Sequence, residues 1–197
     1  MGLNWEKARM DNTLFTGELV RLCADEPAVL AKAFGRWGHD SEYLRLLSTE
    51  PARIWSEAQI KKWIEKEREK PQPEFYGFSI HTLEDDRLIG DIGLDMPQPP
   101  HGDTFVGIGL GDRAYWDQGY GTDAMRIMLG YAFMELGLHR LSLNVFEYNP
   151  RAIRSYQKLG FVEEGRQREF LNREGRRWDM VYMGILREEW EQRKERQ

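Results

Sequence analysis

The stretch YWDQGYGTDAM, residues Tyr115–Met125, places Gly119 and Gly121 one residue apart where a helical pattern begins. Glycine adopts positive φ angles without strain and lets other atoms approach the backbone closely, although it costs conformational entropy on folding. The start of a helix also leaves backbone N–H groups without partners inside the helix, and these groups attract anions. Taken alone, the stretch is compatible with a phosphate cradle or with a tight turn.

The segments on either side of this stretch favour the phosphate cradle. FVGIGL (105–110) precedes it and HRLSLNVF (139–146) follows the helix, and both have the composition and alternation of strands. The helix is predicted from apolar residues at helical spacing, with Asp123 off their stripe: Ala124, Ile127, Met128, Tyr131 and Ala132. In a strand–helix–strand unit, the turn between strand end and helix start is where such sheets hold ligands.

The remaining elements alternate along the chain. Further strands are predicted at 17–24, 75–82 and 87–94, with a final hairpin of 168–172 and 176–186. Further helices are predicted at 24–34, 56–70 and 149–161, and the segment 35–51 between the first two shows no clear period. This order predicts an α+β fold, a mixed α/β sandwich around one sheet.

Helix-start signals support two of these helices. Asp25 is the expected N-cap of the first, with Pro27 in its first turn. Ser56 and Gln59 have the spacing of a capping box at the start of the second.

Composition restricts the class of protein. A chain of 197 residues suits one domain, and its net charge of −5 argues against nucleic-acid binding, which needs a basic surface. Cys23 is the only cysteine, so we expect no intrachain disulfide and no cysteine-based zinc site. We expect no metal in the site. The sequence has no apolar run resembling a signal peptide and none near the roughly 20 residues that span a bilayer. We therefore expect a cytoplasmic protein that binds no membrane.

Two common nucleotide-binding loops are excluded at Gly119–Thr122. A P-loop needs a lysine after its last glycine, and here Thr122 and Asp123 follow Gly121. A dinucleotide-binding fingerprint needs a third glycine and an acidic residue about 20 positions later, and neither is present in that form. A diphosphate held mainly by backbone N–H groups remains, and coenzyme A carries one.

YWDQGYGTDA, together with NPRAIRSYQKLGF (149–161), resembles the GNAT superfamily of acyl-CoA-dependent N-acyltransferases. Gly119 and Gly121 fit the glycine positions of the family loop, Gln/Arg-x-x-Gly-x-Gly/Ala, whereas Trp116 replaces its first residue. That departure is familiar in the branch of ribosomal-protein N-terminal alanine acetyltransferases and spermidine/spermine acetyltransferases. The second block matches at Asn149, Ala152, Tyr156, Lys158, Gly160 and Phe161.

The resemblance spans about 18–190 and implies a mostly antiparallel sheet of about seven strands, splayed between strands 4 and 5 and flanked by helices. It implies acetyl-CoA as cosubstrate, with its pantetheine arm in the splay. The residues that it assigns to acetyl-CoA are Ile108, Gly109, Leu110, Trp116, Asp117, Gln118, Gly119, Tyr120, Gly121, Thr122, Asn149, Arg154 and Lys158. Helix capping alone would also explain Asn149.

The resemblance makes Tyr156 the hydrogen-bond donor to the CoA sulfur, whereas the helical pattern alone makes it a core aromatic. Many family members carry a glutamate on the strand before the glycine loop, and FVGIGL has none. Five other residues are candidates for the base: Glu74, Asp91, His101, Asp103 and Asp179. Asp179 is preferred among them, and a proton path through water is the alternative.

The acceptor implied by the resemblance is a primary amine. A small polyamine is preferred over a protein N-terminus, because the chain is acidic. The missing strand glutamate keeps open a second class of function, a CoA-binding sensor without activity. A homodimer is the common arrangement in the family.

Overall fold

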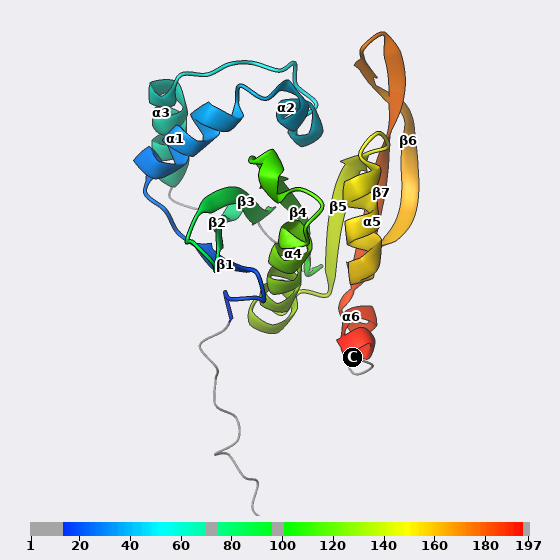
Figure 1. Cartoon of the computed structure of the whole chain (residues 1–197). Helices are drawn as coiled ribbons and strands as arrows, with labels where there is room; N and C mark the ends of the chain where they lie inside the picture. Colours follow the sequence, from blue (N-terminus) through cyan, green and yellow to red (C-terminus); the bar gives the residue numbers. More distant parts are fainter. Residues whose placement is uncertain (1–13, 70–74, 96–100, 195–197) are drawn as a thin grey trace, which may run out of the picture.

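The structure is a computed structural model that describes residues 14–69, 75–95 and 101–194 (Figure 1). The strands are β1 (Val20–Cys23), β2 (Phe75–Thr82), β3 (Leu88–Asp95), β4 (Asp103–Leu110), β5 (Arg140–Phe146), β6 (Val162–Arg173) and β7 (Arg176–Leu186). The helices are α1 (Pro27–Trp37), α2 (Ser41–Leu47), α3 (Glu57–Arg68), α4 (Tyr120–Gly130), α5 (Pro150–Leu159) and α6 (Arg187–Lys194). A 3₁₀ turn, Arg113–Tyr115, precedes α4, and a π-helical turn, Tyr131–Glu135, continues it.

The strands form one seven-stranded sheet in the order β1-β2-β3-β4-β5-β7-β6. Every neighbouring pair is antiparallel except β4 and β5, which run parallel. These two strands pair only at their first residues, from Asp103 opposite Arg140 to Phe105 opposite Ser142. Beyond Phe105 they separate, which confirms the predicted splay between strands 4 and 5.

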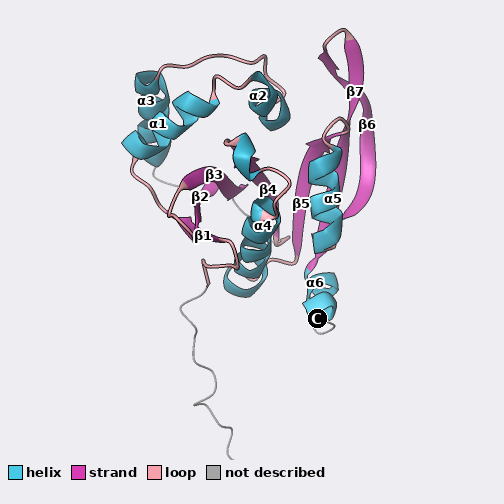
Figure 2. Ribbon diagram, viewed as in Figure 1, coloured by secondary structure: helices cyan, strands magenta, loops and turns pink. Residues whose placement is uncertain are grey.

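The two faces of β3 and β4 differ in chemistry. Ile92, Leu94 and Val106 are buried in the main core with α4, because alternate residues of a strand share a face. The opposite face carries Asp91 and Gly93 of β3 beside Gly109 and Gly107 of β4. Figure 2 shows α4 and α5 side by side across the sheet, next to the splay. No helix within the described ranges is both long enough and apolar enough to cross a membrane.

The segment 35–51, predicted to be irregular, contains the helix α2. Asp40 is its N-cap, and its Oδ1 accepts hydrogen bonds from the N–H groups of Glu42 and Tyr43 at 3.0 and 3.3 Å. The helix is only seven residues long, which is too short for an apolar period to stand out.

Two acidic residues have other roles than those predicted. Glu26, not Asp25, is the N-cap residue of α1, and the Asp25 carboxylate instead pairs with His81 Nε2 at 2.7 Å. Asp123, expected off the apolar stripe, is 2% exposed. Its Oδ2 accepts hydrogen bonds from the N–H groups of Leu19 and Val20, so this buried carboxylate anchors β1 to α4. The capping box of Ser56 and Gln59 is confirmed.

Candidate functional site

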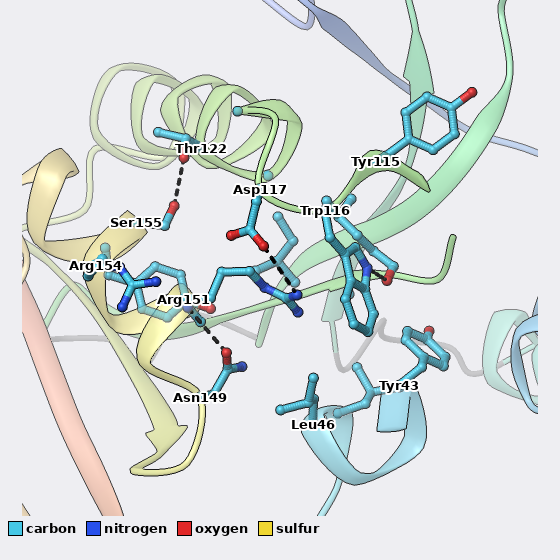
Figure 3. Close-up of a pocket in the computed structure, with 18 of the residues that line it drawn as sticks. Tyr43, Leu46, Tyr115, Trp116, Asp117, Thr122, Asn149, Arg151, Arg154 and Ser155 are labelled. Carbon is cyan, nitrogen blue, oxygen red and sulfur yellow. Dashed lines mark hydrogen bonds and ion pairs between the residues drawn. The ribbon is translucent and has the colours of Figure 1, made fainter. Parts of the chain in front are cut away.

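Two cavities meet at the splay. The first, of about 220 Å³, lies between the end of β4, the start of α4 and α5 (Figure 3). The second, of about 590 Å³, lies over the face of β3 and β4 that carries the glycines. They share the lining residues Leu46, Leu47, Ile108, Asn149 and Tyr156. A ligand in one cavity can therefore meet a ligand in the other beside Tyr156.

The first cavity contains the bare N-terminus of α4. Gly119 is its N-cap, with a φ of +93° and no side-chain hydrogen bond to the helix. Among the described residues, no protein acceptor is found for the N–H groups of Tyr120, Gly121 and Thr122. Such unpartnered N–H groups at the positive end of an eleven-residue helix favour an anion such as a phosphate.

Cationic side chains of α5 line the same cavity. Arg151, Arg154 and Lys158 are spaced at three and four residues, so they share one side of the helix. The guanidinium carbon of Arg151 lies 3.9 Å from the centre of the Trp116 ring, and a guanidinium nitrogen of Arg151 lies 3.9 Å from Asp117 Oδ2. Trp116 in turn donates from Nε1 to the carbonyl of Leu110 at 2.8 Å (Figure 3). The residue that replaces the usual first position of the loop thus ties the loop to the end of β4.

The Tyr156 side chain reaches the point where the cavities meet. Its ring packs edge-to-face on Phe161 with a centroid distance of 6.0 Å, and it adjoins the main core. Burial raises the pKa of Tyr156 to about 12, so the hydroxyl stays protonated at neutral pH. No hydrogen-bond partner for this hydroxyl is found in the described parts of the chain. The ring therefore has the packing role, and the role of the hydroxyl as donor to the CoA sulfur stays a prediction.

The second cavity is acidic and aromatic. Asp91 and Asp95 line it, and the aromatic residues around it are Phe75, Phe105, Phe146, Tyr156 and Tyr182. Within the part of the chain that the structure describes, none of its lining residues is Lys, Arg or His. Burial raises the pKa of Asp91 to about 7 and also raises the pKa of Asp95. This cavity suits a cation with apolar segments.

The helix α2 covers both cavities and is fixed at each end. At its start, Asp40 forms an ion pair with Arg113 of the 3₁₀ turn, which lowers the pKa of Asp40 to about 2. At its end, Arg173 of β6 donates to the carbonyl groups of Arg45, Ser48 and Glu50. The helix places Leu46 and Leu47 where the cavities meet.

The first cavity gathers most of the residues predicted for the cofactor. Those that line it are Ile108, Gly109, Leu110, Trp116, Asp117, Gly119, Gly121, Thr122, Asn149, Arg154 and Lys158. Gln118 and Tyr120 do not line it: Gln118 donates to the carbonyl of Ala114, and Tyr120 packs edge-to-face on Tyr115. Only the backbone N–H groups of these two residues remain candidates for cofactor contacts.

Of the candidate bases within the described residues, only Asp91 lines one of the two cavities. Asp179 lines neither cavity, and its Oδ1 accepts a hydrogen bond from the N–H of Glu169 at 2.8 Å. Glu169 sits in an irregularity of β6 with a φ of +53°, so Asp179 stabilises a bulge. His101 and Asp103 also line neither cavity, and Glu74 lies outside the described residues.

Several lining residues were missed by the sequence analysis. Arg151 could have been predicted, because it shares the helical spacing of Arg154 and Lys158 in the segment 149–161. Tyr43, Leu46 and Leu47 could not, because the helix that carries them was not predicted.

Comparisons with known proteins identify the family of the chain. The model of the "Acetyltransferase (GNAT) domain" family matches residues 19–162. A Bacillus subtilis protein named "Probable N-acetyltransferase YjcK" is 35% identical over 137 residues, which cover 69% of this chain and 75% of that protein. The spermidine N(1)-acetyltransferase of Vibrio cholerae is 36% identical over 78 residues, 40% of this chain and 45% of that protein.

Solved structures show the same fold. The crystal structure of the Vibrio cholerae spermidine N-acetyltransferase in complex with CoA and spermine has a TM-score of 0.73 at 22% sequence identity. The match covers 87% of this chain and 96% of that one. Members of this family take their acyl group from acyl-CoA. The chain belongs to the GNAT acetyltransferase family and is an N-acetyltransferase.

Proposed function

We propose that this protein acetylates a primary amine of a small polycation such as a polyamine, by direct attack of the amine on acetyl-CoA. The separation of charge across the splay carries the proposal. The first cavity holds Arg151, Arg154 and Lys158 with a helix N-terminus, and the second holds Asp91 and Asp95. An anionic cofactor and a cationic acceptor would be attracted to opposite sides of Tyr156.

The residues of the first cavity fit acetyl-CoA. The N–H groups at the start of α4 would receive its diphosphate, and the cations of α5 would meet its phosphate oxygens. The pantetheine arm would lie in the splay, where β4 beyond Phe105 has no strand paired on the side of β5. Gly121 lines this cavity, and a β-carbon there would lie in ordinary contact with Leu110 Cδ1, at 3.4 Å.

Tyr156 would stabilise the departing thiolate by donating a hydrogen bond. A tyrosine of pKa about 12 is a weaker acid than a thiol of pKa about 8.5. Full proton transfer to the sulfur would therefore be uphill by about 3.5 pH units, or about 5 kcal/mol. A hydrogen bond to the developing negative charge needs no such transfer, so we assign this role to the hydroxyl.

The row of residues along β3 supports a linear polyamine as acceptor. Asp91, Gly93 and Asp95 face the second cavity in turn, and four residues of strand span about 13 Å. A β-carbon on Gly93 would lie 2.0 Å from the Phe75 ring, so the ring lies directly over Gly93. Two carboxylates on either side of an aromatic ring match two ammonium groups joined by methylenes, since ring faces also attract cations. The polyamine substrate of the Vibrio cholerae relatives supports the same class.

The test measures release of free thiol from acetyl-CoA by the full chain, with spermidine, other diamines and short peptides with free N-termini as acceptors. We expect the highest kcat/KM with a polyamine and a decline as salt rises, because exposed charges are screened over about 10 Å at 0.1 M salt. Tyr156→Phe should lower kcat by about 10²-fold or less and leave acetyl-CoA affinity unchanged. Tyr131→Phe, a core tyrosine that lines neither cavity, is the matched control.

Peptide acetylation without polyamine turnover would replace the proposed acceptor with a protein N-terminus. Acetyl-CoA binding without thiol release for any amine would instead indicate the inactive module. If Tyr156→Phe keeps the wild-type kcat under conditions where chemistry limits the rate, the hydroxyl has no role in catalysis and Tyr156 only packs in the fold.

A further inference from the structure

We propose that Asp91 is the catalytic base, and that its carboxylate removes a proton from the ammonium group of the acceptor in the second cavity. This inference rests on the proposed function and adds the proton acceptor that it lacks. The sequence offered five candidates, and among the four that the structure describes Asp91 is the one that lines a cavity at the splay.

The position of Asp91 follows from strand register. Asp91 of β3 lies opposite Gly109 of β4, and opposite residues of an antiparallel pair point their side chains to the same face, about 5 Å apart. Gly109 has no side chain, so the carboxylate extends over β4 toward the splay. A β-carbon on Gly109 would lie 3.4 Å from both Asp91 Oδ1 and the Tyr43 hydroxyl oxygen.

This position joins the two cavities. Gly109 and Tyr43 line the first cavity, whereas Asp91 lines the second. The carboxylate therefore borders the passage through which an amine would approach a thioester held along β4. Any larger residue at position 109 would occupy this passage, since Leu47 Cδ1 lies only 3.0 Å from the same β-carbon.

The electrostatic surroundings leave Asp91 able to accept a proton. Arg151, Arg154 and Lys158 line the first cavity, which Asp91 does not line. The titratable groups that line the second cavity with Asp91 are Asp95 of β3, Tyr156 of α5 and Tyr182 of β7, and the Tyr43 hydroxyl of α2 lies beside Gly109. None of these is a cation, and burial without a compensating cation raises the pKa of Asp91 to about 7. Burial also raises the pKa of Tyr43 well above 10, so Tyr43 stays neutral. A base with a pKa near the working pH is both deprotonated and basic enough to act.

The proton balance of the reaction is complete with this residue. One proton passes from the ammonium nitrogen to Asp91 Oδ, and the neutral nitrogen attacks the thioester carbonyl carbon. The N–C bond forms, the C–S bond breaks, and the second proton of the nitrogen neutralises the thiolate beside Tyr156. Asp91 then releases its proton to water in the open second cavity.

The experiment compares wild type with Asp91→Asn in the pH dependence of kcat/KM for spermidine, from pH 6 to 9.5. With Asp91 as base, the wild-type value should rise through a pKa near 7 and then level off, because the protonated amine is the form that reacts. The variant must use the rare neutral amine, so its kcat/KM should be about 10²–10⁴-fold lower near pH 7 and rise tenfold per pH unit throughout. Asp95→Asn is the matched control and should raise KM while keeping the plateau.

A plateau retained in Asp91→Asn, or a wild-type profile that rises tenfold per unit to pH 9.5, would overturn the assignment. Acetyl-CoA affinity measured by calorimetry should be equal in both proteins and shows that the variant is folded. If no amine is acetylated, the proposed function fails on its own, and Asp91 is tested by binding instead. Spermidine is titrated into the CoA complex by calorimetry in buffers of different ionisation enthalpy, which gives the number of protons released on binding. Proton release at pH 6.5 that Asp91→Asn abolishes would support the assignment, and its absence would overturn it.

Discussion

Replacing Arg173 with methionine should loosen α2 without unfolding the sheet. The guanidinium donates to the carbonyl of Ser48 and to the Tyr148 hydroxyl, each at 3.0 Å, and to the carbonyl of Arg45. Methionine keeps an unbranched apolar side chain and removes every donor. The Arg173 guanidinium also donates to the carbonyl of Glu50, and the three contacts with the carbonyls of Arg45, Ser48 and Glu50 hold the end of a seven-residue helix that has little stability of its own.

The size of the effect follows from these contacts. A hydrogen bond from a charged donor contributes about 1.5–3 kcal/mol, and we take about 1 kcal/mol for each because Arg173 is only half-buried. Losing two to three of them costs about 2–3 kcal/mol. At 1.36 kcal/mol for each factor of ten, the opening equilibrium of α2 should shift about 30- to 160-fold.

Hydrogen exchange with mass spectrometry measures this shift directly. Protection of the α2 amides that bond within the helix, Leu44 and Ser48, should fall by that factor, while protection in β5 and β7 stays unchanged. The KM values of both substrates should rise together, because Leu46 and Leu47 line both cavities. Arg177→Met is the control on the same hairpin, since the hydrogen bond that Arg177 donates to the carbonyl of Glu169 is long, at 3.5 Å. Unchanged exchange in α2 would refute this reasoning.

Two further substitutions test other features. Gly119→Ala and Gly137→Ala each force a residue with a side chain into a positive φ, of +93° and +64°, and should each cost about 1–2 kcal/mol in the free energy of unfolding. Only Gly119→Ala should also weaken acetyl-CoA binding in calorimetry, and equal affinities in the two variants would contradict the cradle. Burial lowers the pKa of His81, but hydrogen bonds to Asp25 and Asp86 outweigh it and raise this pKa above 6.5. Its stabilisation is therefore complete below pH 6.5 and lost as pH rises through the folded-state pKa, so the stability difference between wild type and His81→Asn should shrink from pH 5.5 to 8. A difference independent of pH would contradict this.

The sheet and the glycine loop were predictable because their signals are local and repeated. Alternation identifies the strands, and the pair of glycines before a helical stripe marks the turn for which we propose anion binding. The role of α2 was not predictable, because seven residues carry too little period and its anchors, Arg113 and Arg173, are distant in sequence. The different roles of Asp91 and Asp179 could not be predicted for the same reason, because they depend on residues that are distant in sequence. Both are aspartates on strands, and only the register opposite Gly109 and the bulge at Glu169 separate a candidate base from a structural carboxylate.

The short pairing of β4 with β5 has a consequence for how the protein unfolds. Three residue pairs join a half-sheet of β1 to β4 to a half-sheet of β5 to β7, so the hydrogen-bonded link across the middle of the sheet is its weakest line. This line is inside the sheet and not at its edge. Beyond Phe105, the backbone N–H and C=O groups of β4 have no strand paired with them on the side of β5. A pantetheine arm bound there would link the two half-sheets. Acetyl-CoA would then raise the free energy of unfolding of the whole chain by RT ln(1 + [L]/Kd), where [L] is its free concentration and Kd its dissociation constant. We therefore expect the two half-sheets to lose their amide protection separately in the free protein and together when acetyl-CoA is bound.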